Sequence, residues 1–231
     1  MKYLIPSHAM LVFVPRIAAL FFIALQLLGM KAYPGGTMYD ASTQGYSFSK
    51  NFFSDMGAYA ARNGDPNYFS MILFAMSLTI VGITFISYYL LLPRLLGSDR
   101  INYILAWIGT LFAIGGSVCM IGTGFTPSDV VFAPHVFFAN NIFHCFLVTA
   151  LFYTIVIFRS DGLQKRYAIG YAIFFLSIFI YVMILQYGPS VNSGESALIF
   201  QVLSQKVIVI VFFFSVIHQT FGFTESRIFK Q

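Results

Sequence analysis

Six apolar runs, each long enough to cross a membrane as a helix, dominate this sequence. They cover residues 10–30, 68–93, 101–123, 132–158, 167–187 and 198–221. A helix needs about 20 apolar residues to span the hydrocarbon core of a bilayer, and inside lipid only helices and closed barrels satisfy every backbone polar group. The runs therefore predict an all-α, polytopic membrane protein, a bundle of six transmembrane helices that forms a single domain over residues 1–231.

The composition excludes an ordinary soluble domain. Of the 231 residues, 58% are apolar and 9% are charged, whereas a soluble protein has about 25% charged residues. The net charge of +5 comes from basic residues that lie mainly between the apolar runs, which is typical of membrane topology signals rather than of a nucleic-acid-binding surface. We therefore expect membrane lipids and no nucleic acid as partners. We expect no cofactor, because the sequence has no nucleotide-, flavin- or haem-binding pattern.

The distribution of lysine and arginine predicts the orientation in the membrane, because short cytoplasmic segments are enriched in both. If successive runs alternate in direction, nine of the 13 basic residues lie on one side: Lys2, Arg16, Arg94, Arg100, Arg159, Lys165, Arg166, Arg227 and Lys230. The opposite side has Lys31, Lys50 and Arg62, and Lys206 lies within the last run. The bias predicts a multi-pass protein of the plasma or inner membrane, with both termini in the cytoplasm and residues 31–67 as a long outer loop.

The outer loop contains the most informative short segment of the chain, residues 48–60. On a helical projection, Asn51, Ser54 and Asp55 share one face, while the aromatic residues of the segment and Met56 form another. We expect an interfacial helix that turns the three polar residues toward the bundle and the aromatic stripe toward lipid. A merely solvated polar face is the alternative.

Two short segments resemble a known family. Residues 51–57, Asn-Phe-Phe-Ser-Asp-Met-Gly, resemble the Asn-x-x-Ser-Asp-Leu-Gly signature of a prokaryotic six-helix membrane family described as domain of unknown function nine hundred and ninety-eight. Residues 124–129, Gly-Phe-Thr-Pro-Ser-Asp, followed by His135, are similar to the Gly-x-x-Pro-x-Asp and His arrangement of that family. The Ser-Asp-x-Gly element is more distantly similar to one in the eukaryotic Frag, DRAM and Sfk membrane proteins.

The resemblance implies a six-helix topology but no particular reaction, because the prokaryotic family has none assigned. The eukaryotic proteins imply a connection with lipid and glycolipid handling. Met56 replaces the usual Leu, a change that preserves volume. Near the last run, Gln201, Gln205 and Lys206 match the Gln-Arg pair of the family only loosely, so the role of Lys206 has to be argued from physical chemistry.

Lys206 is expected about halfway through the membrane. It follows Leu198 by eight positions, or ~12 Å along a regular helix. An unpaired lysine at this depth costs roughly 2.5 to 3.5 kcal/mol on insertion scales, so its side chain should face the bundle interior and find a partner. Asp55 and Asp129 are the carboxylates that we expect to approach it. A structural ion pair, a lysine that reaches outward along a crevice and a functional lysine remain open.

The histidines of the fourth run do not predict a metal site. His135 and His144 are nine positions apart, which turns them about 180° from each other on one helix. Asn141 and His144 share a face at the expected depth of Lys206. They predict either a hydrogen-bonded seam between the fourth and sixth runs or a proton relay or substrate site.

His135 is expected at the outer interface, close to Asp129 and level with Asp55. A histidine beside carboxylates is suited to general base catalysis, although it also suits the start of a helix. We expect Asp55, His135 and Lys206 to form one polar cluster in the outer half of the membrane.

Small residues mark the third run as a packing helix. The run contains Gly109, Ala113, Gly116 and Ser117, which are separated by three or four positions or are adjacent. Small residues let neighbouring helix backbones approach closely. We expect this helix at the centre of the bundle.

Three classes of function are compatible with these patterns. The first is an intramembrane lipid hydrolase or acyl transferase, with Asp55 and His135 as catalytic residues and Ser54 or water as the nucleophile. The second is a non-catalytic lipid-binding or regulatory protein in which Asp55, His135, Asp129 and Ser54 only hold the outer loop in place. The third is a small transporter that uses Lys206 and His144, which six helices support only as a homodimer or with partners. The absence of a recognisable nucleophile and base pair favours the second class.

Overall fold

The computed structural model describes residues 8–226, and six long helices make up most of this region. They are α2 (Val14–Ala32), α3 (Tyr68–Leu96), α4 (Arg100–Phe125), α5 (Phe132–Arg159), α6 (Lys165–Tyr187) and α7 (Glu195–Glu225). A π-helical turn, η1 (Ala9–Phe13), precedes α2. Each of the six is long and apolar enough to cross a membrane, with η1 and α2 forming one span. The prediction of an all-α, six-helix protein is confirmed, and the described residues contain no β-strand.

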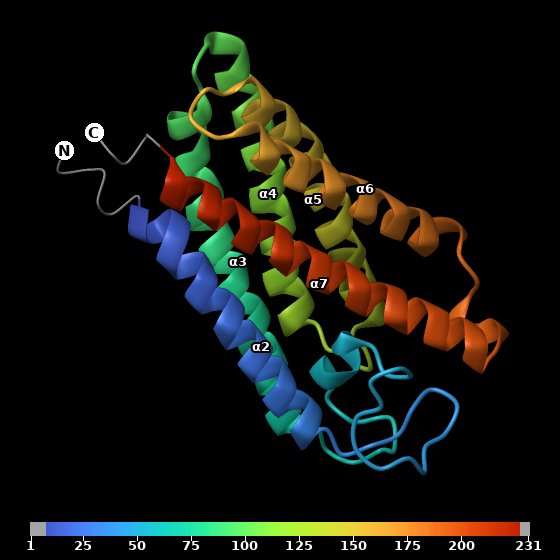
Figure 1. Ribbon diagram of the computed structural model, residues 1–231. Helices are drawn as coiled ribbons and strands as arrows, with labels where there is room; N and C mark the ends of the chain where they lie inside the picture. The colour runs from blue at the N-terminus through green and yellow to red at the C-terminus, as the bar shows by residue number, and fades with distance from the viewer. Residues whose placement is uncertain (1–7, 227–231) are drawn as a thin grey trace.

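The helices pack mainly on their neighbours along the chain, and α7 returns across the bundle toward α2 (Figure 1). The start of α2 and the end of α7 lie at one end of the bundle, and the loop between α2 and α3 lies at the other. The rings of Phe22 on α2 and Phe213 on α7 stack with centroids 4.4 Å apart. Helices α2 and α7 diverge toward the loop end of the bundle (Figure 1).

Helix α4 is the close-packed helix that its small residues predict, but it lies between α3 and α5 and not at the centre of the bundle. A Cβ atom added at Gly109 would lie 2.9 Å from the ring of Tyr153, and one added at Gly116 would lie 2.7 Å from the ring of Phe146. Ala113 is fully buried. Both aromatic residues come from α5, so glycine at these positions allows α5 to pack directly against α4.

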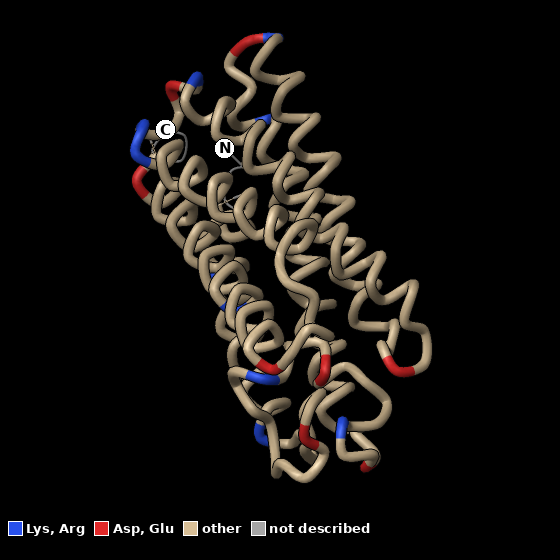
Figure 2. The backbone as a smooth tube through the Cα atoms, turned by 90° about the vertical axis from the view of Figure 1, so that its right-hand side faces the viewer, with Lys and Arg blue, Asp and Glu red and all other residues tan. Residues whose placement is uncertain are grey.

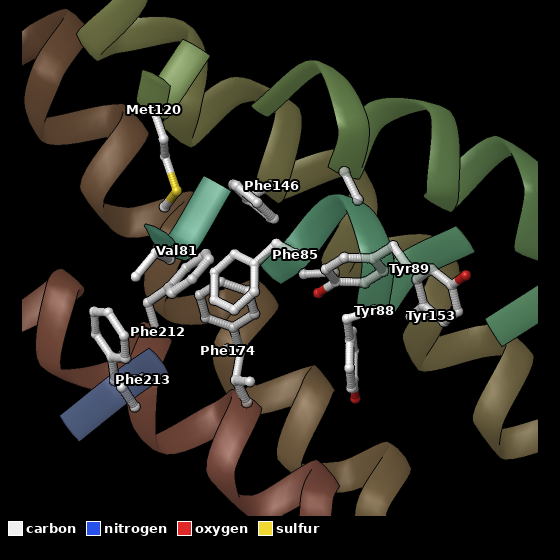
Figure 3. Close-up of a cluster of buried hydrophobic side chains, with 14 of the residues drawn as sticks. Val81, Phe85, Tyr88, Tyr89, Met120, Phe146, Tyr153, Phe174, Phe212 and Phe213 are labelled. Carbon is white, nitrogen blue, oxygen red and sulfur yellow. The ribbon is translucent and has the colours of Figure 1, made fainter. Parts of the chain in front are cut away.

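An aromatic cluster fills the centre of the bundle. The ring centroid of Phe212 lies 4.7 Å from that of Phe146, 5.1 Å from Phe174 and 5.2 Å from Phe85. In Figure 3 these rings lie between three tyrosines on one side and Met120 and Phe213 on the other. Offset and edge-to-face aromatic pairs add to the apolar burial, and this cluster separates the loop end of the bundle from the opposite end.

Charged residues gather at the two ends of the bundle (Figure 2). The end where α2 begins and α7 finishes has six described basic residues, Arg16, Arg94, Arg100, Arg159, Lys165 and Arg166. The loop end has Lys31, Lys50 and Arg62 together with five acidic residues, Asp40, Asp55, Asp65, Asp129 and Glu195. Lys2, Arg227 and Lys230, which also entered the orientation argument, lie outside the described residues.

Candidate functional site

The loop between α2 and α3 folds back over the end of the bundle, but not as the helix expected over residues 48–60. Its only regular element in the described chain is a short 3₁₀ helix, η2 (Phe53–Gly57). The side-chain oxygen of Asn51 accepts the N–H of Ser47 at 2.9 Å, and Asp55 Oδ2 accepts the N–H of Phe52 at 2.8 Å. Side chains that bind local backbone amides compete with helix formation, so the predicted helix was wrong in extent.

The faces of this segment also differ from the prediction at one position. Asn51 and Asp55 are buried, as expected of residues turned toward the bundle. Met56, expected on the lipid-facing stripe with the aromatic residues, is fully buried instead. The shorter helical turn changes the phase of the segment and points this side chain inward.

Asp55 pairs with Arg62, a residue of the same loop. Arg62 Nε and Nη2 donate to Asp55 Oδ1 at 3.0 and 2.8 Å, and Asn51 Nδ2 donates to Asp55 Oδ2 at 3.3 Å. The side chain of Asp55 is 6% exposed and that of Arg62 is 44% exposed. Burial lowers the pKa of Arg62, but the charge of Asp55 and the hydrogen bonds to it outweigh burial and raise this pKa above its ordinary value. Together with the Phe52 amide, these contacts saturate the buried carboxylate.

Lys206 is buried as expected, but its partner is not a carboxylate. Its Nζ donates to the carbonyl oxygen of Asn51 at 2.7 Å and to the hydroxyl of Tyr46 at 3.1 Å. The same atom lies 4.7 Å from the ring centroid of Phe53 and 5.0 Å from that of Phe48, distances at which aromatic faces stabilise a cation. The ammonium group is therefore enclosed by a carbonyl, a phenol and aromatic rings.

The expected cluster of Asp55, His135 and Lys206 forms only in part. Lys206 makes no ion pair with Asp55 or Asp129 within the described chain. Instead Asn51 links the two charges, since its carbonyl binds Lys206 and its side-chain amide binds Asp55. The pairing with a carboxylate was wrong because Arg62 already occupies Asp55.

Asp129 fastens the loop to the connection between α4 and α5. Its two carboxylate oxygens accept the N–H groups of Tyr59 and Ala60, each at 2.9 Å. His135, buried at the start of α5, is 2.6 Å from the carbonyl oxygen of Thr126 through Nδ1. Because a carbonyl only accepts, Nδ1 carries the proton. The described chain shows no hydrogen bond between His135 and a carboxylate, so the expected base and carboxylate pair is not assembled.

Asn141 and His144 make no described hydrogen bond to Lys206. Asn141 Nδ2 donates to the carbonyl oxygen of Phe137, one turn earlier on α5. His144 Nδ1 contacts the carbonyl oxygen of Asn140 at 2.9 Å, and His144 Nε2 lies 3.4 Å from Gln186 Nε2 on α6. The hydrogen-bonded seam was expected between the fourth and sixth spans, which are α5 and α7. The observed contact instead joins α5 to α6, the fifth span, because α6 packs against both α5 and α7.

A cavity of about 80 Å³ lies beneath η2 and is lined by residues of η2, α2, α3, α4, α5 and α7. Its walls are mostly apolar and include Phe22, Phe74, Leu78, Met120, Phe212 and Phe213. Four polar residues also line it, Gln26, Ser54, Thr123 and Gln205. A cavity needs roughly 10 to 15 Å³ in this measure for each water-sized group, so it has room for several. Of the predicted site residues, only Ser54 is among those that line it.

The sequence analysis assigned no part in this region to Arg62, Gln26 or Gln205, the last of which it named only beside Lys206. Arg62 was counted only as a loop cation, although it was the nearest basic residue after Asp55. Gln26 is the only polar side chain between Arg16 and Lys31, and such a residue within an apolar run is a signal that could have found it.

Among residues 8–226, no group of three or more histidine, cysteine, aspartate or glutamate side chains is placed to hold a metal ion. Comparison of the chain with protein-family models, with curated proteins and with solved structures found no significant match.

Proposed function

We propose that this chain is a multi-pass protein of the cell membrane that binds a lipid, without reacting with it, in the cavity beneath η2. In this proposal the α2–α3 loop is a cap on the outer side of the membrane, and both termini are cytoplasmic. The observation that carries the proposal is a mostly apolar cavity covered by a loop whose buried charges are already satisfied. Ligand sites for apolar molecules are lined in this way, with a few polar groups among apolar ones.

The contacts of the candidate residues favour binding over catalysis. The oxygens of Asp55 accept hydrogen bonds from within the loop, and those of Asp129 accept hydrogen bonds that join the loop to the α4–α5 connection. Ser54 lines the cavity, but neither Asp55 nor His135 does. A serine nucleophile needs a base within hydrogen-bond reach, and the described part of the chain records no such bond to Ser54.

The central aromatic cluster favours binding over transport. Phe85, Phe146, Phe174 and Phe212 fill the bundle below the cavity, and Lys206 points toward the loop rather than toward the opposite end. A carrier of polar solutes that used Lys206 would need a polar path past these rings.

The resemblance to the prokaryotic six-helix family is part of the proposal, and the contacts give its motif a physical basis. Asn51 and Asp55 hold the cap, and Ser54 faces the cavity. A Cβ atom at Gly57 would lie 2.5 Å from the ring of Phe74. The motif residues Asn51, Ser54, Asp55 and Gly57 are therefore those that a cap in direct contact with the bundle requires.

The orientation is tested by topology reporters fused to the C-terminus and inserted in the α2–α3 loop. The excess of basic residues at the other end of the bundle predicts a cytoplasmic C-terminus and an external loop. An external C-terminus would contradict the proposal.

Lipid binding is tested by filling the cavity. Ala139 lines it, so Ala139→Phe should displace the bound lipid. Ala133, on the same helix but exposed, provides the control Ala133→Phe. Mass spectrometry of lipids that remain with the protein after delipidation in mild detergent should show a tightly held lipid in wild type and Ala133→Phe and its loss in Ala139→Phe. Equal lipid content in all three proteins would overturn the proposal.

A further inference from the structure

The polar residues that line the cavity lie toward its loop end. Helices α2 and α4 both run toward the loop end of the bundle (Figure 1). On α2, the polar lining residue Gln26 follows the apolar Phe22 by four positions, and on α4 Thr123 follows Met120 by three. One helical turn contains 3.6 residues, so on each helix the polar residue lies about one turn nearer the loop.

The same order holds on α7 and at the roof of the cavity. Helix α7 starts at the loop end, and its polar lining residue Gln205 precedes Phe212 by seven positions, or about two turns. The fourth polar residue, Ser54, belongs to η2, which covers the cavity. The deepest lining residues of the five helices are all apolar, Phe22, Leu78, Met120, Phe143, Phe212 and Phe213. The cavity is therefore polar near the loop and apolar at its deep end.

The central aromatic cluster closes the deep end of the cavity. The ring centroid of Phe212 lies 4.7 Å from that of Phe146 and 5.1 Å from that of Phe174, and Met120 and Phe213 lie beside these rings (Figure 3). The cavity is nevertheless partly open to the outside. A hydrocarbon chain that enters it has to end there, because the aromatic rings leave no way past them.

The volume of the cavity admits part of one hydrocarbon chain. At roughly 10 to 15 Å³ for each water-sized group, a cavity of about 80 Å³ holds about five to eight such groups. A methylene group is close to a water molecule in size, so the enclosed segment is shorter than one palmitoyl chain. A whole membrane lipid, with its headgroup and chains, does not fit.

The lining offers a lipid headgroup few partners. No charged residue lines the cavity, and burial of an unpaired charge is very costly. Two of the polar lining residues are engaged within the protein, since the Thr123 hydroxyl donates to the carbonyl oxygen of Cys119 at 2.8 Å and Gln205 Oε1 accepts the N–H of Phe53 at 3.0 Å. An apolar chain end suits this space better than a phosphate, an ammonium group or a sugar does.

We propose that the lipid enters tail first, so that the last carbons of a single hydrocarbon chain, about five to eight of them, fill the cavity. The chain end lies on the aromatic floor, the chain leaves past the polar residues near η2, and the headgroup stays outside. This inference rests on the proposed lipid binding and specifies which part of the lipid is recognised. The ligand class is defined by an apolar chain end and not by a particular headgroup.

The test compares four probes that share a palmitoyl chain, which are palmitoyl lysophosphatidylcholine, monopalmitin, palmitic acid and ω-hydroxypalmitic acid. Each competes with radiolabelled palmitic acid for the delipidated full-length protein in a non-ionic detergent. The first three should bind within about threefold of one another, because their headgroups remain outside the cavity. The ω-hydroxyl group should weaken binding about tenfold relative to palmitic acid, because it buries a hydroxyl without a partner at the apolar floor.

Met120 gives a variant that should remove this penalty. Met120→Gln changes the volume of the side chain little but supplies an amide that can pair with the ω-hydroxyl group. The variant should bind ω-hydroxypalmitic acid within about threefold of palmitic acid. Met183, which is 36% exposed on α6 and does not line the cavity, provides the control Met183→Gln, which should keep the tenfold preference of the wild type.

Three results separate this inference from the proposed lipid binding. Equal binding of palmitic acid and ω-hydroxypalmitic acid by the wild type would overturn the inference while lipid binding stands, because the chain end would then lie outside the cavity. Differences of about tenfold or more among the three headgroups, or an unchanged tenfold preference in Met120→Gln, would also overturn it. If the wild type binds none of the four probes, lipid binding itself fails.

Discussion

Replacing Asp55 with asparagine removes the charge that organises the cap while preserving its shape. In the wild-type protein Oδ1 accepts two hydrogen bonds from Arg62, and Oδ2 accepts one from the amide of Phe52 and one from the side chain of Asn51. An asparagine has one oxygen and one NH₂ group. Whichever way it turns, its NH₂ group faces two donors, so two of the four hydrogen bonds are lost.

The expected loss of stability is about 2 to 3 kcal/mol. Hydrogen bonds to charged groups contribute ~1.5 to 3 kcal/mol each, but Arg62 is 44% exposed and regains water when its partner changes. Solvent screening lowers the free energy that such an ion pair contributes. The expected loss of stability is therefore well below that of two fully buried hydrogen bonds to a charged group. Asp65→Asn, in the same loop but exposed, should change stability by less than ~0.5 kcal/mol.

The assay is reversible unfolding in mixed micelles, applied to Asp55→Asn, Arg62→Met and the double variant. Each single change strands the other residue, so the double variant should recover about 1 to 2 kcal/mol relative to the sum of the two losses. Additive losses would refute the reasoning, since they would show that Asp55 and Arg62 do not act as a pair.

Two other contacts give equally direct predictions. Asp129→Ala frees the amides of Tyr59 and Ala60, so hydrogen exchange at these two residues should accelerate about fivefold or more, as expected for ~1 kcal/mol of lost protection; unchanged exchange would contradict this. Gly116→Val drives a side chain into the ring of Phe146 and should lower the free energy of unfolding by about 1 to 3 kcal/mol. A variant that is as stable as wild type would show that α4 and α5 pack more loosely than described.

The six helices could be predicted because apolar runs are a local property of the chain. The small residues of α4 were equally informative, since Gly109 and Gly116 have a direct consequence for helix spacing. The burial of Lys206 followed from its depth in the last run, because a charge at that depth must turn inward.

The partners of the site residues could not be predicted in the same way. Hydropathy predicts that Lys206 is buried, but not that a carbonyl and aromatic rings replace a carboxylate as its partner. The helical projection of residues 48–60 failed because Asn51 and Asp55 bind backbone amides of their own loop. Such competition depends on tertiary contacts. The hydrogen bond from Gln26 to Ser77 became evident only once α2 and α3 were placed side by side.

The occupant of the cavity is measured most directly by photo-crosslinking in native membranes. A diazirine analogue of leucine placed at Leu78, which lines the cavity, reports what lies inside it. The same analogue at Leu111, which is 63% exposed on α4, reports the surrounding bilayer. Mass spectrometry should find one predominant lipid attached at Leu78 and the mixed membrane lipids at Leu111. The same lipid mixture at both positions, or no lipid adduct at Leu78, would contradict lipid binding beneath the cap.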